Sequence, residues 1–267
     1  MRTVRSAVTV LVVVLGVLAS AVLAAPAASA ATPARYVALG DSYSSGLGAG
    51  SSYTGGSCDR SSGAFSALWA AAHSPAAYLS LACAGATTAG VVSSQLPALP
   101  SDTTLVSITA GGNDVGFRTI ITTCALQGTS ACTAAVDRAE AVATSALPGQ
   151  LDSTYRAIAA KAPGARVVVL GYPTFYQLHV WFCVGLSETS RAKIDEGIDL
   201  VDRQLAAAAA RRGFTFADVP SAFTGHQLCS GSKWLHATDL AHLAESYHPT
   251  ATGQAQGYLP AFTAAAG

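Results

Sequence analysis

The sequence predicts an α/β fold, a three-layer α/β/α sandwich built on a five-stranded parallel sheet. Short β-rich runs alternate with longer Ala-rich runs, which is typical of parallel strands joined by helices. The strand candidates are also mostly apolar along their length, as strands covered on both faces must be. No internal repeat or long linker interrupts this alternation, so one domain is expected.

The elements follow one another in a regular order. Strong helix formers predict one long helix over Ala134–Ala162, which Pro148 can interrupt, and another over Glu188–Arg212, where Gly213 supplies a stop. A shorter helix is expected after Pro249. Five strands are expected, at Tyr36–Leu39, Tyr78–Ala82, Leu105–Thr109, Arg166–Leu170 and Phe214–Ala217.

Composition excludes several kinds of partner. The 267 residues include 15 basic and 15 acidic side chains, so the formal net charge is zero. The chain therefore lacks the excess positive charge that attracts nucleic acids or anionic membranes. We expect no nucleic-acid partner, no stable membrane insertion of the mature chain, and a monomer.

The first 30 residues have the pattern of a secretory signal peptide. Two arginines near the start precede the apolar run Val8–Leu23 and the small-residue cleavage site Ala28-Ser29-Ala30. An uncleaved membrane anchor is the alternative, since the apolar run approaches the length that spans a bilayer. The small residues and Pro26 directly behind the run favour cleavage. The mature domain should then span residues 31–267 and be secreted.

The cysteines indicate disulfides. All six lie after the leader, and an even count in an exported chain is typical of an oxidised set. Six cysteines allow 15 pairings. No C-x-x-C pair occurs, so a structural zinc site or a redox pair has little support. Chain order suggests the pairs Cys58–Cys83, Cys124–Cys132 and Cys183–Cys229.

Candidate chemistry gathers behind the first three strands. Gly40-Asp41-Ser42 follows the first, Cys83-Ala84-Gly85 the second, and Gly111-Gly112-Asn113-Asp114 the third. Ligands bind outside the carboxyl ends of parallel strands, because loops and helix N-termini converge there. Ser42 could be a nucleophile only if a base takes its proton. Taken alone, it could equally be a helix N-cap.

Four blocks in order resemble a known family. They are the run Gly40–Gly46 (GDSYSSG), Ala84-Gly85-Ala86, Gly111–Asp114 and His248-Pro249-Thr250. Together they resemble the GDSL or SGNH hydrolases, and within them the secreted actinobacterial lipases and phospholipases A1, over nearly the whole mature chain. The resemblance implies a flavodoxin-like sheet, Ser42 as nucleophile and His248 as general base. It also implies an oxyanion hole formed by the backbone N–H groups of Ser42 and Gly85 and the side-chain amide of Asn113.

The group that orients His248 is left open by the sequence. Many relatives carry Asp three residues before the histidine, where this chain has Glu245. In some secreted relatives the backbone carbonyl two residues before the histidine orients the ring instead, here that of Ser246. We favour Ser246, because the run from Glu245 to Pro249 most resembles theirs.

A metal site is the competing interpretation of the same region. His236, Asp239, His242, Glu245 and His248 recur every three residues. They lack the H-E-x-x-H spacing, and a three-residue period drifts around a helix. We therefore expect no metal and no cofactor.

The resulting hypothesis is a serine ester hydrolase, a lipase or esterase that forms an acyl-enzyme on Ser42. Phospholipase A1 is the nearest alternative, followed by a carbohydrate O-acetylesterase and by an inactive binding module. Activity should rise between pH 5 and 9 as His248 loses its proton. The aromatic and aliphatic residues at Tyr172–Tyr176, Trp181-Phe182 and Trp234-Leu235 could line an acyl groove or belong to the core, and we favour the groove.

Overall fold

One parallel sheet organises the chain. The computed structural model describes residues 33–267 except 51 and 240–241, so the expected signal peptide lies outside the described residues. The strand order β2-β1-β3-β4-β5 is that of flavodoxin-like sheets, which confirms the predicted fold class. The predicted strands are present with ends shifted by a few residues: β1 (Arg35–Gly40), β2 (Ala77–Ser80), β3 (Leu105–Thr109), β4 (Arg166–Leu170) and β5 (Thr215–Ala217).

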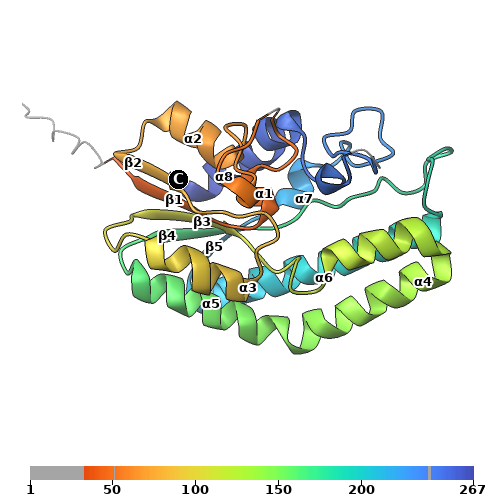
Figure 1. Cartoon of the computed structure of the whole chain (residues 1–267), viewed down its shortest axis with the longest axis horizontal. Helices are drawn as coiled ribbons and strands as arrows, with labels where there is room; N and C mark the ends of the chain where they lie inside the picture. The colour runs from red at the N-terminus through yellow and green to blue at the C-terminus, as the bar shows by residue number, and fades with distance from the viewer. Residues whose placement is uncertain (1–32, 51, 240–241) are drawn as a thin grey trace, which may run out of the picture. The chain divides into compact units, whose positions relative to one another are not determined.

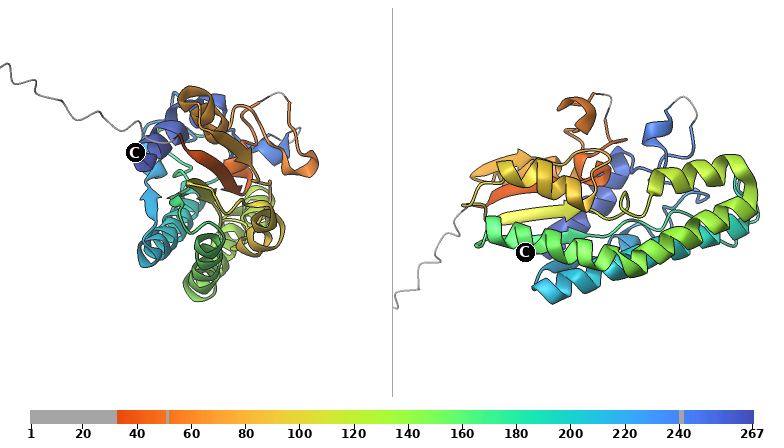
Figure 2. Two further views of the ribbon diagram at one scale, coloured as in Figure 1. Left: turned by 90° about the vertical axis from the view of Figure 1, so that its left-hand side faces the viewer. Right: turned by 60° about the horizontal axis from the view of Figure 1, so that its bottom comes forward.

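Helices cover both faces of this sheet. Helices α2 and α8 lie on one face, and α3, α5 and α6 lie on the other (Figures 1 and 2). The helices are α1 (Ser42–Ser45), α2 (Phe65–His73), α3 (Thr88–Gly90), α4 (Phe117–Ser145), α5 (Leu147–Lys161), α6 (Glu188–Arg212), α7 (Val219–Ala222) and α8 (Leu259–Ala266). Short 3₁₀ segments lie at Gly56–Cys58, Leu96–Ala98 and Leu243–Glu245, and π segments at Val91–Gln95 and Gly253–Tyr258.

The central strands are buried because helices pack on both their faces. β3 is buried at every position, whereas β1 and β4 are exposed only at their first residues, Arg35 and Arg166. The edge strand β2 is only half-buried. The apolar runs that predicted the strands therefore form the core of the sandwich.

The predicted helix over Ala134–Ala162 begins too late, because α4 already begins at Phe117. Its interruption near Pro148 is confirmed, since the chain forms two helices there. They meet at Ala146, and Pro148 occupies the first turn of α5, where a missing N–H costs no hydrogen bond. The segment before Ala134 is rich in threonine, whose low helix propensity hid the first half of α4.

Helix α4 consists of two arms. Gly128 has φ 78° and ψ 178°, a conformation outside the helical region, and it divides residues 117–127 from residues 129–145. The disulfide between Cys124 and Cys132 joins the two arms. Glycine adopts this backbone geometry without a steric penalty, so Gly128 allows the break between the two arms.

The other long helix agrees with the sequence. α6 has the predicted bounds, with Ser187 as a side-chain N-cap and Gly213 in the left-handed region at its end. The helix expected after Pro249 is present as a π segment followed by α8. This last element brings the chain back to the sheet beside β4 and β5.

Three disulfides are formed, and they are the pairs that chain order suggested. The first closes the Gly-rich excursion after α1 onto the segment that follows β2. Among the described residues, no helix has both the length and the apolar character needed to cross a bilayer. This finding does not cover the apolar run of the leader, which lies outside the described residues.

Candidate active site

A tight turn after β1 presents Ser42. Gly40 has φ 116°, and a Cβ on it would lie 2.2 Å from the carbonyl oxygen of Thr109 in the neighbouring strand. Only glycine fits this approach. The N–H of Asp41 then donates to that same carbonyl at 2.9 Å, and α1 begins at Ser42. The sheet itself thus fixes the position of the serine.

The structure brings Ser42 and His248 together from opposite ends of the chain. The Nε2 atom of His248 lies 2.7 Å from the Oγ atom of Ser42. The Nδ1 atom lies 3.2 Å from the backbone carbonyl oxygen of Ser246. With Nδ1–H donating to that carbonyl, Nε2 carries the lone pair that can take the serine proton.

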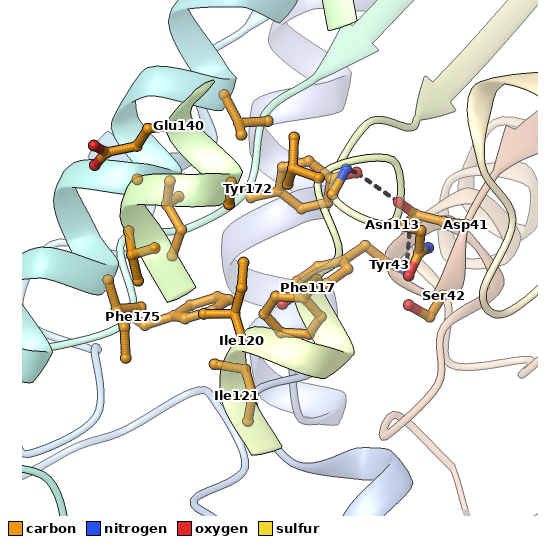
Figure 3. Close-up of a pocket in the computed structure, with 18 residues that line it drawn as sticks. Asp41, Ser42, Tyr43, Asn113, Phe117, Ile120, Ile121, Glu140, Tyr172 and Phe175 are labelled. Atoms are coloured by element: carbon orange, nitrogen blue, oxygen red, sulfur yellow. Dashed lines mark hydrogen bonds between the residues drawn. The ribbon is translucent and has the colours of Figure 1, made fainter. Parts of the chain in front are cut away.

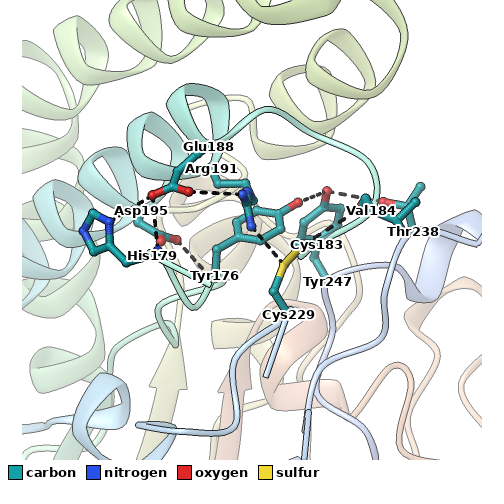
Figure 4. Close-up of a disulfide and its surroundings, with 10 residues drawn as sticks. All are labelled: Tyr176, His179, Cys183, Val184, Glu188, Arg191, Asp195, Cys229, Thr238 and Tyr247. Atoms are coloured by element: carbon teal, nitrogen blue, oxygen red, sulfur yellow. Dashed lines mark hydrogen bonds and ion pairs between the residues drawn. A yellow bond between two sulfur atoms is a disulfide. The ribbon is translucent and has the colours of Figure 1, made fainter. Parts of the chain in front are cut away.

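Tyrosine hydroxyls hold the loop that carries His248. Tyr247 has φ 68°, a left-handed conformation that costs energy for a non-glycine residue. Its carbonyl accepts from the hydroxyl of Tyr43 at 2.9 Å, and its own hydroxyl lies 2.6 Å from that of Tyr176 (Figure 4). These contacts keep the Ser246 carbonyl aimed at the imidazole. These roles of Tyr43 and Tyr247 were not predicted from the sequence, although both residues are adjacent to Ser42 or His248.

The carboxylate of Glu245 has a different partner. Its Oε1 atom accepts from the hydroxyl of Tyr53 at 2.8 Å, and that hydroxyl in turn accepts from the N–H of Gly48 at 3.0 Å. The carboxylate therefore ties the loop after α1 to the loop before His248. The backbone carbonyl of Ser246 therefore lies at hydrogen-bond distance from the imidazole, whereas the Glu245 carboxylate is bound to Tyr53.

A Glu245→Gln substitution should therefore retain most of kcat. Glutamine can still accept from Tyr53, whereas loss of an essential triad acid costs about 10⁴-fold. Steady-state hydrolysis of p-nitrophenyl butyrate measures the difference. A fall of about a thousandfold or more, without a change in melting temperature, would assign the orienting role to Glu245.

The imidazole is neutral at ordinary pH. Burial lowers the pKa of His248 from 6.5 to about 4, and the nearby charges of His236 and Arg118 act in the same direction. The backbone contacts with Ser246 and Glu245 oppose the shift without cancelling it. A neutral ring is the form that can act as a general base.

The pH dependence should reflect this shift. We expect kcat/KM to rise with pH through a midpoint near 4. Above about pH 5.5 His248 is deprotonated, so its titration should cause no further rise. This replaces the rise between pH 5 and 9 expected from an unshifted histidine.

Because the folded pKa is depressed, His248 also favours the folded state above pH 6.5, and that contribution is lost as pH falls through 4. Circular dichroism at each pH separates unfolding from protonation, and a kinetic midpoint near 6.5 in folded protein would contradict the assignment.

Three polar donors are the candidates for an oxyanion hole. Within the described part of the chain, the backbone N–H groups of Ser42 and Gly85 have no acceptor. Asn113 donates one amide hydrogen to the carbonyl of Ala86 at 3.0 Å, which fixes its side chain and leaves a second hydrogen available. Ser42 and Asn113 border the same pocket. Donors without acceptors are what a developing oxyanion requires.

Asp41 is buried under this turn. Its carboxylate caps α1 by accepting from the N–H of Tyr43 at 3.0 Å, and it also accepts from the hydroxyls of Thr109 and Tyr172 at 2.7 and 2.6 Å. Burial raises the pKa of Asp41 to about 6, and the hydrogen bonds from Tyr172 and Thr109 oppose that rise. Asp41 thus supports the turn and does not touch the imidazole.

The five residues of the alternative metal site do not converge. His248 contacts Ser42, His236 contacts a backbone carbonyl, and Glu245 contacts a tyrosine hydroxyl. His242 pairs with Asp239 at 3.0 Å. Over residues 33–267 without the gaps, no group of three such side chains is placed to hold a metal ion.

An apolar pocket opens beside the serine. Its empty volume is about 660 Å³, counting the part open to solvent. Of the aromatic residues expected around a groove, Tyr172 and Phe175 border it (Figure 3). Trp181 is instead 98% exposed on the loop before α6, and Trp234 stacks on a histidine away from the pocket. The prediction of a groove lined by all three aromatic segments is wrong, because helices α4 and α6 supply most of the wall.

Comparison with known sequences places the chain among ester hydrolases. The sequence model of the GDSL-like lipase/acylhydrolase family matches residues 38–256. Lipase 1 of Streptomyces coelicolor is 54% identical, over 94% of this chain and 97% of that protein. A lipase of Streptomyces rimosus is 52% identical, over 92% of this chain and 91% of that protein.

Solved structures agree with this. The extracellular lipase of Streptomyces rimosus superposes with a TM-score of 0.84 at 52% identity, over 87% of this chain and 99% of that one. Phospholipase A1 of Streptomyces albidoflavus superposes with a TM-score of 0.85 at 50% identity, with the same coverage. An acetyl-xylooligosaccharide esterase of Geobacillus reaches a TM-score of 0.53 at 14% identity, which shows a shared fold only.

Proposed function

Because the chain belongs to the GDSL-like lipase/acylhydrolase family, we propose that it acts as a lipase through a Ser42–His248 dyad. It is a carboxylic ester hydrolase whose substrates are acyl esters of lipids. The observation that carries the proposed site is the 2.7 Å contact between His248 Nε2 and Ser42 Oγ. A base at that distance can take the serine proton as the hydroxyl attacks.

Acylation follows from this contact. His248 removes the proton from Ser42, and the freed oxygen bonds to the ester carbonyl carbon. The carbonyl oxygen becomes an anion facing the N–H groups of Ser42 and Gly85 and the amide of Asn113. When the ester C–O bond breaks, the imidazolium returns the proton to the leaving alcohol, and the acyl group remains on Ser42.

Deacylation repeats these steps with water. His248 takes a proton from a water molecule, whose oxygen attacks the acyl carbon, and Ser42 leaves with the proton as the carboxylic acid forms. In both steps the Ser246 carbonyl accepts a hydrogen bond from the Nδ1–H of His248. Its dipole stabilises the imidazolium, in place of the full negative charge that a carboxylate would supply. The same carbonyl fixes the tautomer that the first step needs.

Removal of the Asn113 amide tests the oxyanion hole. We expect Asn113→Ala to lower kcat about 10²- to 10³-fold with little change in KM, because the lost donor acts mainly in the transition state. Steady-state kinetics on p-nitrophenyl butyrate measures it. Asn113→Asp places an acceptor at the same site and should be at least as damaging. An equal rise in KM with kcat unchanged would instead assign Asn113 to ground-state binding.

A substrate panel tests the reaction itself. We expect the purified mature protein to release fatty acid from p-nitrophenyl esters and triolein, and Ser42→Ala to release none. Phospholipase A1 activity is the second candidate, favoured by the 50% identical phospholipase structure. Faster release from phosphatidylcholine than from triolein would establish it. Release from acetylated xylan alone would contradict lipid specificity.

We also propose that the protein is secreted after cleavage near Ala31. The leader pattern supports this, since the positive start, the apolar run and the cleavage site occur in the expected order. The three disulfides support it as well, because such bonds persist in oxidising compartments. N-terminal sequencing of protein from the culture medium tests the site of cleavage.

A further inference from the structure

We propose that the pocket beside Ser42 binds the acyl chain of the ester and that its far end, between α4 and α6, sets the longest chain accepted. This inference rests on the proposed function. At one end the pocket is bordered by Ser42 and Asn113, and at the other by Val136, Ala139 and Glu140. Figure 3 shows Ser42 and Glu140 at opposite ends, with Phe117 and Ile120 between them.

The walls between the two ends are apolar. Both arms of α4 contribute, the first through Phe117, Ile120 and Ile121, and α6 contributes Ile198 and Val201. A sugar or a lipid headgroup placed there would lose its hydrogen bonds to water without gaining new ones. A hydrocarbon chain loses nothing and leaves water, so the lining selects an acyl chain.

The two helices close the far end by packing tightly. A Cβ on Gly197 of α6 would lie 2.9 Å from the Cγ1 atom of Val136 on the second arm of α4. That distance is shorter than carbon atoms tolerate, so a larger residue at position 197 would have to displace Val136 or move the helices apart. Gly197 and Val136, which both border the pocket, thus form a tightly packed contact at its far end.

A charged group reinforces this end. The Oε2 atom of Glu140 pairs with Lys193 Nζ at 2.8 Å, and both side chains are less than 20% exposed, at 19% and 18%. The other oxygen, Oε1, is buried and has no partner in the described part of the chain. A chain long enough to reach Glu140 would put methylene groups against this carboxylate and remove its remaining access to water. Chains that stop at Ala139 avoid that cost.

Two matched alanine variants test the proposal. Ala139 and Ala135 lie one turn apart on α4 and are similarly buried, at 8% and 5% exposure, but only Ala139 borders the pocket. Ala139→Leu fills the far end, whereas Ala135→Leu adds the same atoms outside the pocket. For each variant, kcat/KM is measured on p-nitrophenyl acetate, octanoate and palmitate, together with the melting temperature.

We expect Ala139→Leu to lower the palmitate-to-acetate ratio about tenfold or more, since a few methylene groups decide such discrimination. Ala135→Leu should leave the ratio unchanged. Val136→Ala, which enlarges the same end without overpacking, should raise the ratio and decides the matter if Ala139→Leu does not fold. An unchanged ratio in both pocket variants, or an equal fall in Ala135→Leu, would overturn the proposal. Failure of the proposed function looks different, because the wild-type protein would then hydrolyse none of the three esters.

Discussion

Ser42→Ala should lower kcat by on the order of 10⁶-fold, the loss seen when the catalytic serine is removed from a serine protease. The alanine keeps the backbone N–H and the turn at Gly40, so the oxyanion donors remain in place. What disappears is the hydroxyl oxygen that lies 2.7 Å from His248 Nε2. Steady-state hydrolysis of p-nitrophenyl butyrate provides the measurement.

The fold should survive this change. Ser42 is almost fully buried, and its hydroxyl has His248 as its partner among the residues that the structure describes. An unchanged melting temperature therefore shows that the loss is chemical. Ser93→Ala, which removes an exposed serine hydroxyl, serves as the matched control and should be as active as the wild type. Activity of Ser42→Ala within tenfold of the wild type would exclude an acyl-enzyme on Ser42.

His248→Ala should have an effect of similar size. Without the imidazole the serine keeps its proton and is a weak nucleophile. Because the two residues act as a unit, the Ser42→Ala/His248→Ala double variant should be no slower than either single variant. The kcat values of the three variants, measured on one substrate, test this directly.

His226→Ala is the control for a histidine that performs no chemistry. That ring stacks on Trp234 at 3.5 Å between centroids, and its Nδ1–H donates to the backbone carbonyl of Ser232 at 2.7 Å. Its loss should leave kcat near the wild-type value.

A different result for the Ser42→Ala/His248→Ala double variant would contradict the dyad. If its kcat fell by the product of the two single effects, Ser42 and His248 would act independently.

The sheet could be predicted from the sequence because its signal is local. Runs such as Leu105–Thr109 are apolar throughout, and a strand buried on both faces has no other pattern. The first arm of α4 could not be predicted, since Thr119, Thr122 and Thr123 lower its helix propensity. The Cys124–Cys132 bond ties this arm to the second one and restrains it in the fold.

The candidate site was predictable where it is carried by motifs. Ser42, Asn113 and His248 belong to short blocks that resemble a family, and the topology brings them to one edge of the sheet. Partners from outside these blocks were hidden, because a tyrosine hydroxyl such as that of Tyr53 or Tyr176 has no sequence signature. The choice between Glu245 and Ser246 likewise depends on where a side chain points, which only the structure shows.

The most direct test of the dyad is to map the residue that reacts with a fluorophosphonate. The probe phosphonylates a serine only where a base takes the proton and donors hold the resulting oxygen. Mass spectrometry of the labelled mature protein should find one modification, on Ser42, formed at a rate that falls at acid pH with the midpoint of hydrolysis, near 4. Modification of a different residue in an active preparation, or full activity without modification of Ser42, would contradict the mechanism.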